Sequence, residues 1–168
     1  MSDLSAALAR TRTFVLDVDG VLTDGTVLVS ENGDLLRRMH IQDGYALQAA
    51  VRAGYRVCVI TGGSSDGVRK RLARLGVVDF YSGVRDKTEV LVAYAERHGL
   101  DLAEALYVGD DLPDLGPMRR VGLACAPANA RPEVIAEAHY VSPLSGGEAC
   151  VRDLIERVLK LNGQWPAA

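Results

Sequence analysis

The sequence predicts an α/β fold in which a mainly parallel sheet is covered by helices on both faces and carries a projecting β-hairpin. Short apolar runs alternate with helical patterns along the 168 residues, an order typical of strand–helix–strand units. The strand candidates are almost continuously apolar, as expected for strands buried on both faces. An Asn32-Gly33 pair between two strand-like runs is a strong hairpin signal.

The N-terminal third is predicted to contain one strand, the hairpin and one helix. The first 12 residues read as a short polar lead-in, and the first strand is predicted over Thr13–Leu16. Thr26–Ser30 and Asp34–Met39 then flank the Asn-Gly turn. Asp43–Ala53 has helical spacing and is followed by glycine, a common helix terminator.

Two further pairs of strand and helix follow in the middle of the chain. The strand Tyr55–Ile60 leads to a helix over about Ser65–Leu75, and the short strand Val77–Tyr81 leads to a helix over Asp86–His98. Glu89 lies three residues after the N-cap candidate of this last helix, which resembles a capping box.

The C-terminal part adds strands at Ala105–Val108 and Val121–Ala124. Between them a helix is predicted to start near Pro113, because proline suits the first turn of a helix. Arg131–Ala138 and Glu148–Leu161 are the last predicted helices.

Length and composition predict one domain and exclude several classes of partner. No repeat or linker divides residues 1–168, so we expect a single domain with its hairpin at about 26–39 and a tail at 162–168. The net charge of −3 provides no basic surface for nucleic acid. The apolar runs are far shorter than the ~20 residues that span a bilayer, and the N-terminus lacks the apolar core of a signal peptide. We therefore expect a cytoplasmic protein that binds neither nucleic acid nor membrane.

The three cysteines predict no disulfide and no metal site. Cys58, Cys125 and Cys150 are odd in number and widely spaced. Buried, reduced thiols are the expected outcome.

Polar residues follow the predicted strands at the points where these strands end. Asp17 and Asp19 follow the first strand, Thr61 follows the next one of the sheet, and Asp110 follows a later one. Lys87 lies at the start of the helix that follows the predicted strand Val77–Tyr81. Because ligands of parallel sheets bind beyond the carboxyl ends of the strands, we expect these residues to face one site.

Lys87 has a structural and a functional interpretation. A cation in the first turn of a helix opposes the macrodipole by ~0.3–1 kcal/mol. In the structural interpretation it is a solvated lysine balanced by neighbouring acids. In the functional one it binds phosphate, and its removal should then weaken turnover while leaving stability unchanged or slightly improved.

This set of groups suits a phosphate monoester together with Mg²⁺. A phosphate dianion ~4 Å from a carboxylate is repelled by roughly 8 kcal/mol at an effective dielectric near ~20, so a cation must lie between them. Asp17 and Asp110 can supply carboxylates to Mg²⁺, while Thr61, Lys87 and nearby backbone N–H groups can hold the phosphoryl oxygens. Asp17 could attack phosphorus to form an aspartyl-phosphate, with Asp19 acting first as acid and then as base.

The spacing of these residues leaves no room for a cap domain. Only 41 residues separate Asp19 from Thr61 and 25 separate Thr61 from Lys87, and predicted elements fill both intervals. An uncapped site must either accept large substrates or be closed by a neighbouring subunit.

Four motifs in order carry a resemblance: DVDGVLTDG (17–25), VITGG (59–63), Lys87 and GDDLPD (109–114). The set resembles the haloacid-dehalogenase-like phosphatases. Through QDGYAL (42–47), YSGVRDK (81–87) and SGGEACVRDLIERVL (145–159), the chain also resembles the cap-less 3-deoxy-D-manno-octulosonate 8-phosphate phosphatase family, from residue 14 to about 160. The resemblance implies a Rossmann-like three-layer fold, Mg²⁺ as cofactor and a place in lipopolysaccharide biosynthesis. It also implies a homotetramer whose hairpins pack together and whose tails reach adjacent sites.

The resemblance implies a role for each motif residue. Asp17 would be the nucleophile and a metal ligand, Asp19 the acid/base whose main-chain carbonyl also touches the metal, and Asp110 a metal ligand. The surrounding residues would be Thr61, Gly62 and Lys87 for the phosphate, and Asp111 and Asp114 for the metal or its loop.

One position departs from the pattern of the family. Members that act on the octulosonate phosphate usually carry arginine after Thr-Gly, whereas this chain has Gly63. The carboxylate of the substrate would then meet Arg69 or Arg74 on the following helix, or a residue of a neighbouring subunit. A nine-carbon sialic-type acid 9-phosphate or a phosphorylated polymer end is the alternative substrate. A non-catalytic interaction domain is a third hypothesis, although no charged motif is missing.

Overall fold

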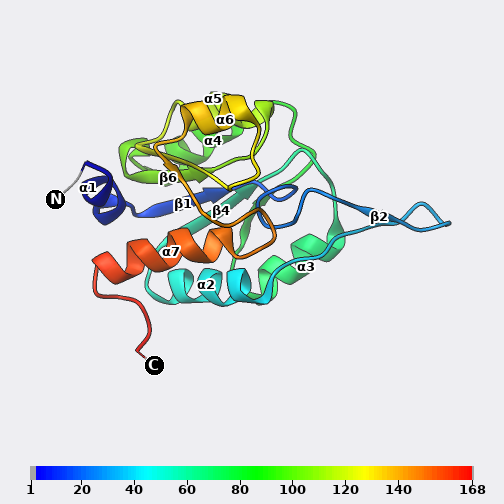
Figure 1. The fold of residues 1–168 in the computed structure, drawn as a ribbon, viewed down its shortest axis with the longest axis horizontal. Helices are drawn as coiled ribbons and strands as arrows, with labels where there is room; N and C mark the ends of the chain where they lie inside the picture. Colours follow the sequence, from blue (N-terminus) through cyan, green and yellow to red (C-terminus); the bar gives the residue numbers. More distant parts are fainter. Residues whose placement is uncertain (1–2, 168) are drawn as a thin grey trace.

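A six-stranded parallel sheet forms the centre of the computed structural model, which describes residues 3–167 (Figure 1). Its strand order is β5-β4-β1-β6-β7-β8, and every neighbouring pair is parallel. The strands are β1 Thr13–Leu16, β4 Arg56–Ile60, β5 Asp79–Tyr81, β6 Ala105–Val108, β7 Leu123–Ala126 and β8 Tyr140–Val141. Chain order reverses beside β1, which places a topological switch point between β1 and β6.

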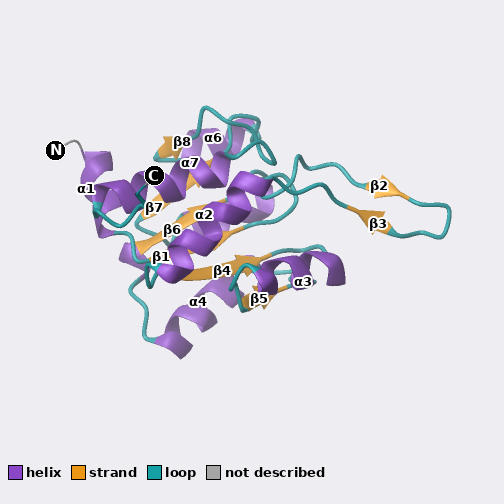
Figure 2. Cartoon of the chain, turned by 90° about the horizontal axis from the view of Figure 1, so that it is seen from below, coloured by secondary structure: helices purple, strands orange, loops and turns teal. Residues whose placement is uncertain are grey.

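Helices cover both faces of the sheet, as Figures 1 and 2 show. The side chains of β1 alternate between two cores: Phe14 and Leu16 pack with Leu72 and Leu154, whereas Val15 packs with Leu91 on the opposite face. The helices of the first face are α1 Asp3–Arg10, α2 Ile41–Arg52, α3 Asp66–Arg74 and α7 Cys150–Leu161. Those of the second face are α4 Lys87–His98, α5 Leu115–Met118 and α6 Pro132–Glu137. The predicted three-layer α/β fold is therefore confirmed.

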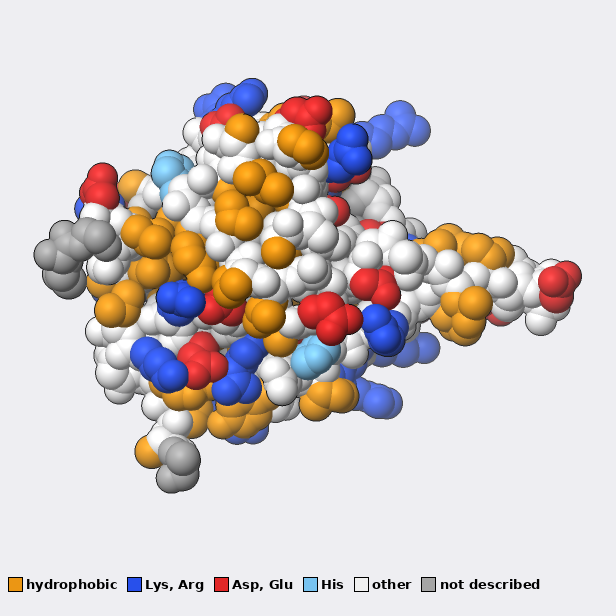
Figure 3. Space-filling model, in the orientation of Figure 1, with side chains coloured by type: hydrophobic (Ala, Val, Ile, Leu, Met, Phe, Trp, Pro, Cys, Tyr) orange, Lys and Arg blue, Asp and Glu red, His pale blue; other side chains and the backbone are white. Residues whose placement is uncertain are grey.

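The hairpin projects from this body, as predicted, but its paired part is short (Figure 1). Its strands are β2 Leu28–Val29 and β3 Leu35–Leu36, in antiparallel register. Five apolar residues of the hairpin are more than two-fifths exposed, because no element within residues 3–167 covers them: Val27, Leu28, Val29, Leu35 and Leu36. In Figure 3 these hydrophobic side chains line the projecting arm.

Helix α7 depends on a residue of another helix for its N-terminal cap. Its own N-cap residue, Ala149, has φ 72° and forms no side-chain cap. The buried Asp43 of α2 accepts a hydrogen bond of 2.7 Å from the backbone N–H of Arg152 instead. Burial raises the pKa of Asp43 to about 6. The carboxyl group thus joins the start of α7 to the first turn of α2.

Several predicted boundaries differ from the structure. The N-terminal lead-in contains α1, whose Leu8 is buried against the α7 side of the core. Strand β7 begins at Leu123, two residues later than predicted, and β8 was not predicted. Near Pro113 there is a short 3₁₀ helix, η2 Leu112–Asp114, followed by α5; a second 3₁₀ helix, η1 Leu102–Glu104, precedes β6.

The predicted state of the cysteines is confirmed: all three are buried free thiols. Among residues 3–167, every helix is too short or too polar to cross a membrane.

Candidate functional site

The carboxyl ends of three central strands bring the predicted polar residues to one edge of the sheet. Asp17 directly follows β1, Thr61 directly follows β4, and Asp110 comes two residues after β6. Lys87 is the first residue of α4 and reaches the same edge from the second helical layer. This edge includes the switch point between β1 and β6.

The ammonium group of Lys87 is buried between two carboxylates. Its Nζ lies 2.9 Å from Oδ2 of Asp17 and 2.7 Å from Oδ1 of Asp114. Asp114 is fully buried and also accepts a 2.8 Å hydrogen bond from the hydroxyl of Tyr107. Its Oδ2 accepts from the backbone N–H groups of residues 110 and 111. Asp114 therefore fixes both the lysine and the loop that carries Asp110.

The sequence interpretation of Asp111 and Asp114 as supporting residues needs refinement. Asp111 is exposed, and its side chain accepts a hydrogen bond from the N–H of Leu112 at the start of η2. Asp114 alone reaches the charged cluster. Its burial depends on Gly109 and the turn of η2, which no sequence spacing reveals.

Burial, and then the crowding of carboxylates, raises the pKa values of two aspartates at this edge. Burial first, and then the charge of Asp114, raise the pKa of Asp17 to about 6, although Lys87 opposes the shift. Burial and the charges of Asp17 and Asp114 raise the pKa of Asp110 to about 7. For Lys87, burial alone would lower the pKa, but Asp114 and Asp17 outweigh it and the pKa is raised. The site thus holds a surplus of negative charge.

The donor set fits a magnesium ion. One carboxylate oxygen from each of Asp17, Asp110 and Asp114 lies within 4.8 Å of the others. Oδ1 of Asp110 is buried without a hydrogen-bond partner among the described residues. Gly20, at φ 94°, admits this carboxylate, because a Cβ there would lie 2.0 Å from Oδ2 of Asp110. Buried oxygen donors with uncompensated charge are what a hard divalent cation requires.

The carboxylate of Asp19 lies apart from this cluster, although it follows Asp17 by two residues. It is 34% exposed, and Arg37 holds both of its oxygens. Nε of Arg37 donates to Oδ1 at 2.6 Å, and Nη2 donates to Oδ2 at 3.2 Å. Arg37 follows β3 in the returning arm of the hairpin, and sequence reasoning missed it because nothing local links positions 18 residues apart.

Thr61 and the loop after it close the site on the β4 side. Thr61 is buried, and its Oγ1 accepts a 3.2 Å hydrogen bond from the N–H of Gly63. Helix α3 begins only at Asp66, with Ser65 as the N-cap. The exposed Gly62 therefore belongs to a loop and not to the first turn of a helix.

Neither arginine predicted on α3 lies next to the acidic cluster. The guanidinium of Arg69 stacks 4.8 Å from the ring centroid of Phe80 and donates to Oγ of Ser82 at 3.2 Å. Arg74 is exposed at the far end of the helix. A hollow of about 690 Å³ between the hairpin and the start of α3 is lined instead by Arg37 and Arg71.

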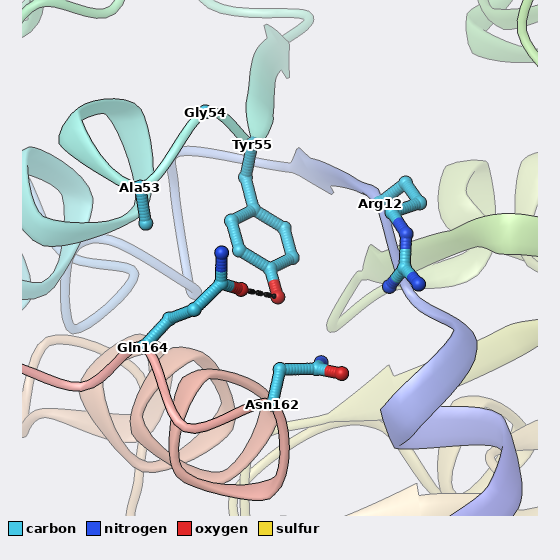
Figure 4. A pocket seen from close by; sticks show the side chains of 6 residues that line it. All are labelled: Arg12, Ala53, Gly54, Tyr55, Asn162 and Gln164. Atoms are coloured by element: carbon cyan, nitrogen blue, oxygen red, sulfur yellow. Dashed lines mark hydrogen bonds between the residues drawn. The ribbon is translucent and has the colours of Figure 1, made fainter.

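A second hollow, of about 360 Å³, lies at the opposite edge of the sheet (Figure 4). It is lined by Arg12 and Tyr55, which precede β1 and β4, and by Gln164, which accepts a 2.7 Å hydrogen bond from the hydroxyl of Tyr55. No carboxylate lines it. The chemistry of this hollow differs from that of the acidic edge, and we place the candidate site at the latter.

Comparison with known proteins defines the class. Residues 44–122 match the model of haloacid dehalogenase-like hydrolases. The chain is 35% identical over 167 residues to the 3-deoxy-D-manno-octulosonate 8-phosphate phosphatase KdsC of Escherichia coli, which covers 99% of this chain and 89% of the relative. It therefore belongs to the 3-deoxy-D-manno-octulosonate 8-phosphate phosphatase family, as the resemblance of its motifs predicted.

Solved structures agree with this assignment. The phosphatase from Yersinia pestis has a TM-score of 0.95 and 30% identity, covering 97% of this chain and 88% of its own. The enzyme from Moraxella catarrhalis, solved with magnesium, phosphate and KDO, has a TM-score of 0.93 and 33% identity, covering 96% and 92%.

The geometry reverses the sequence-based expectation for the stability of a Lys87 variant. Lys87→Ala would leave two buried carboxylates without their cation, so we expect the free energy of unfolding at pH 7 to fall by roughly 3–5 kcal/mol. Urea unfolding of the metal-free protein measures this change. Lys70→Ala on the exposed side of α3 serves as the control and should change little. A Lys87 variant as stable as the wild type would contradict the buried ion pairs.

Stabilisation by Mg²⁺ should depend on pH. In the metal-free protein the pKa values of Asp17 and Asp110 are about 6 and about 7, both above the ordinary value of 3.8. The folded state therefore binds protons more tightly than the unfolded state, and these groups stabilise it below about pH 4 and lose that effect as pH rises through 6–7. Mg²⁺ needs the deprotonated forms. We expect added Mg²⁺ to raise the melting temperature more at pH 8 than at pH 5.5.

Asp110→Asn tests the assignment of this effect. The variant should lose most of the Mg²⁺-dependent rise at pH 8, because it lacks the unpaired buried oxygen as an anionic donor. An equal rise in both proteins would place the metal elsewhere.

Proposed function

We propose that this protein hydrolyses 3-deoxy-D-manno-octulosonate 8-phosphate to the free sugar acid and inorganic phosphate, with Mg²⁺ as cofactor. Membership of the phosphatase family supports the substrate class. The observation that carries the proposal is the cluster in which Asp17 pairs with Lys87 and lies close to Asp110, whose Oδ1 is buried and has no hydrogen-bond partner among the described residues. Asp19, the remaining motif carboxylate, lies beside this cluster and pairs with Arg37.

Asp17 has the surroundings of a positioned nucleophile. Its Oδ1 accepts a 2.7 Å hydrogen bond from the N–H of Val18, and its Oδ2 is paired with Lys87. These two contacts fix the plane of the carboxylate at the end of a buried strand. When bound by Asp17, Asp110 and the main chain of Asp19, Mg²⁺ would neutralise the approaching phosphate and polarise its oxygens.

The reaction then has two balanced steps. An oxygen of Asp17 attacks phosphorus while the bond between phosphorus and the sugar oxygen breaks, and Asp19 gives its proton to that sugar oxygen. Water next attacks phosphorus and gives a proton to Asp19, which releases phosphate and restores the Asp17 carboxylate. Lys87, Thr61 and the N–H groups of the loop at Gly62 hold the phosphoryl oxygens in both steps.

The sugar acid would extend from this point along the hairpin. The hollow between the hairpin and α3 shares Arg37, Ser65 and Val68 with the crevice above Asp19. Arg69 and Arg74 stay proposals for recognition of the sugar carboxylate. A nine-carbon sialic-type acid 9-phosphate is the alternative substrate, favoured by the space that Gly63 leaves open.

We also propose a cytoplasmic homotetramer built around the hairpins, each subunit being one catalytic domain without a cap. The exposed apolar side chains of the hairpin support this, because an isolated two-stranded hairpin is marginal in water. The tail contacts its own chain: Trp165 packs against Tyr45 and against the guanidinium of Arg152. A tail that reaches an adjacent site would have to leave these contacts.

Phosphate release from a panel of monoesters tests the function. We expect Mg²⁺-dependent turnover, fastest with 3-deoxy-D-manno-octulosonate 8-phosphate among that ester, a sialic-type acid 9-phosphate and p-nitrophenyl phosphate. Asp17→Asn should abolish turnover, because no second nucleophile is in place. Asp101→Asn, at the opposite edge of the sheet, should not. Preference for the nine-carbon ester would favour the alternative, and an active Asp17→Asn would refute the mechanism.

Sedimentation tests the assembly. Leu28 and Leu36 face each other across the hairpin and are 69% and 55% exposed. The double substitution Leu28→Ser, Leu36→Ser should dissociate the oligomer at micromolar concentration without unfolding the subunit, since no core residue changes. Val78→Ser, at an exposed site outside the hairpin, should leave it intact. A monomeric wild type would contradict the proposed tetramer.

A further inference from the structure

Arg37 connects the hairpin to the carboxylate of Asp19, the proposed acid/base. Its side chain is only 7% exposed, although the hairpin residues before it are open to solvent. Two of its nitrogens donate to the two oxygens of Asp19. The third, Nη1, donates to the backbone carbonyl of Leu35 at 3.3 Å. The guanidinium is thus held by the backbone of the hairpin and in turn holds both oxygens of Asp19.

Gly63 provides the space that this arrangement needs. A Cβ at position 63 would lie 2.8 Å from Oδ2 of Asp19 and 3.2 Å from Nη2 of Arg37. Both distances are shorter than ordinary contacts of a Cβ atom. The carboxylate and the guanidinium therefore pack directly over a bare Cα, and a larger residue at 63 would push the pair apart or displace it.

We propose that Arg37 positions the carboxylate of Asp19 for catalysis, and that Gly63 leaves the space in which the two side chains pair. The inference rests on the proposed function, because it assigns how the acid/base of that reaction is oriented. Arg37 acts through Asp19 and transfers no proton: Asp19 gives its proton to the sugar oxygen and later takes one from water. The bidentate contact fixes the direction of the carboxylate during both transfers.

Orientation matters here because Asp19 is otherwise weakly constrained. Its side chain is about one-third exposed, whereas Asp17 is buried and held by two partners. A displacement of ~1 Å in a reacting group can reduce turnover by about a hundredfold. The hairpin therefore contributes to catalysis by orienting Asp19, in addition to offering a surface to other subunits.

A set of variants tests the assignment. Arg37→Met removes the charged fork and keeps much of the aliphatic stem, and Arg37→Lys keeps one donor. We expect Arg37→Met to lower kcat roughly ten- to a hundredfold with KM changed less than about threefold, and Arg37→Lys to recover part of the loss. Arg38→Met is the matched control, because Arg38 is the next residue and pairs with Asp24 and Glu148 at the surface. It should keep the kcat of the wild type, and light scattering should give one assembly state for all variants.

Combination with Asp19→Asn shows whether Arg37 acts through Asp19. In that background, Arg37→Met should cause no further loss of kcat. Gly63→Ala should lower kcat in the wild type and add nothing in Asp19→Asn. The proposal would be overturned if Arg37→Met lowered kcat by the same factor in the wild type and in Asp19→Asn. It would also be overturned if Arg37→Met left kcat of the wild type unchanged. If Arg37→Met does not fold, Arg37→Lys and Gly63→Ala give the same comparison.

A sugar phosphate whose leaving group is an alkoxide separates this proposal from the proposed function, because its leaving oxygen needs the proton of Asp19. An active wild type with an Arg37→Met variant of equal kcat would refute the positioning role alone. If the wild type hydrolyses no monoester, the proposed function fails, and the pair is tested by NMR of the arginine Nε–H groups. We expect a slowly exchanging Nε–H signal of Arg37 that is lost in Asp19→Asn. Its absence from the wild type would overturn the placement of Arg37.

Discussion

The buried ammonium group of Lys87 is the interaction on which the site depends. Charges inside a protein are tolerated only when they are paired and hydrogen-bonded. Lys87 meets this condition through Asp17 at the end of β1 and Asp114 in η2. One side chain thereby joins the central strand, the helix α4 and the loop that carries Asp110. The same contacts that allow the lysine to be buried also place Asp17, the proposed nucleophile, and the loop that carries Asp110.

The balance of charge explains why the site is suited to an anion only together with a metal. Three carboxylates lie close together and only two of them pair with the ammonium group, so burial and mutual repulsion raise the pKa values of Asp17 and Asp110 despite Lys87. A phosphate alone would add to this repulsion. A divalent cation reverses the sign of the local field. Bound metal is therefore expected to raise the affinity for phosphate, and bound phosphate the affinity for metal.

Much of this arrangement follows from the sequence, and the limits have a physical origin. Strand β1, the Asp86 cap of α4 and the alignment of Asp17, Thr61 and Lys87 depend on local patterns and on the rule that parallel strands end at one edge. Helix α1 and strand β8 were missed because packing, not local propensity, stabilises elements so short. The ion pair of Arg37 and the burial of Lys87 were also missed, since both arise between segments distant in the chain.

Because Asp43 of α2 caps the start of α7, the two helices must both be present before this part of the chain can fold. Strands β1, β4 and β6, with their polar ends, leave the ribosome well before residues 150–161. Until then one face of the sheet lacks the side chains of Leu154 and Ile155 that cover it. The carboxylate of Asp43 also lacks the backbone N–H of Arg152 from which it accepts a hydrogen bond. The residues before position 150 therefore cannot complete their fold until α7 has been synthesised. The sheet edge that carries Asp17 and Asp110 is therefore expected to take its final shape only after α7 has been made and has packed against α2.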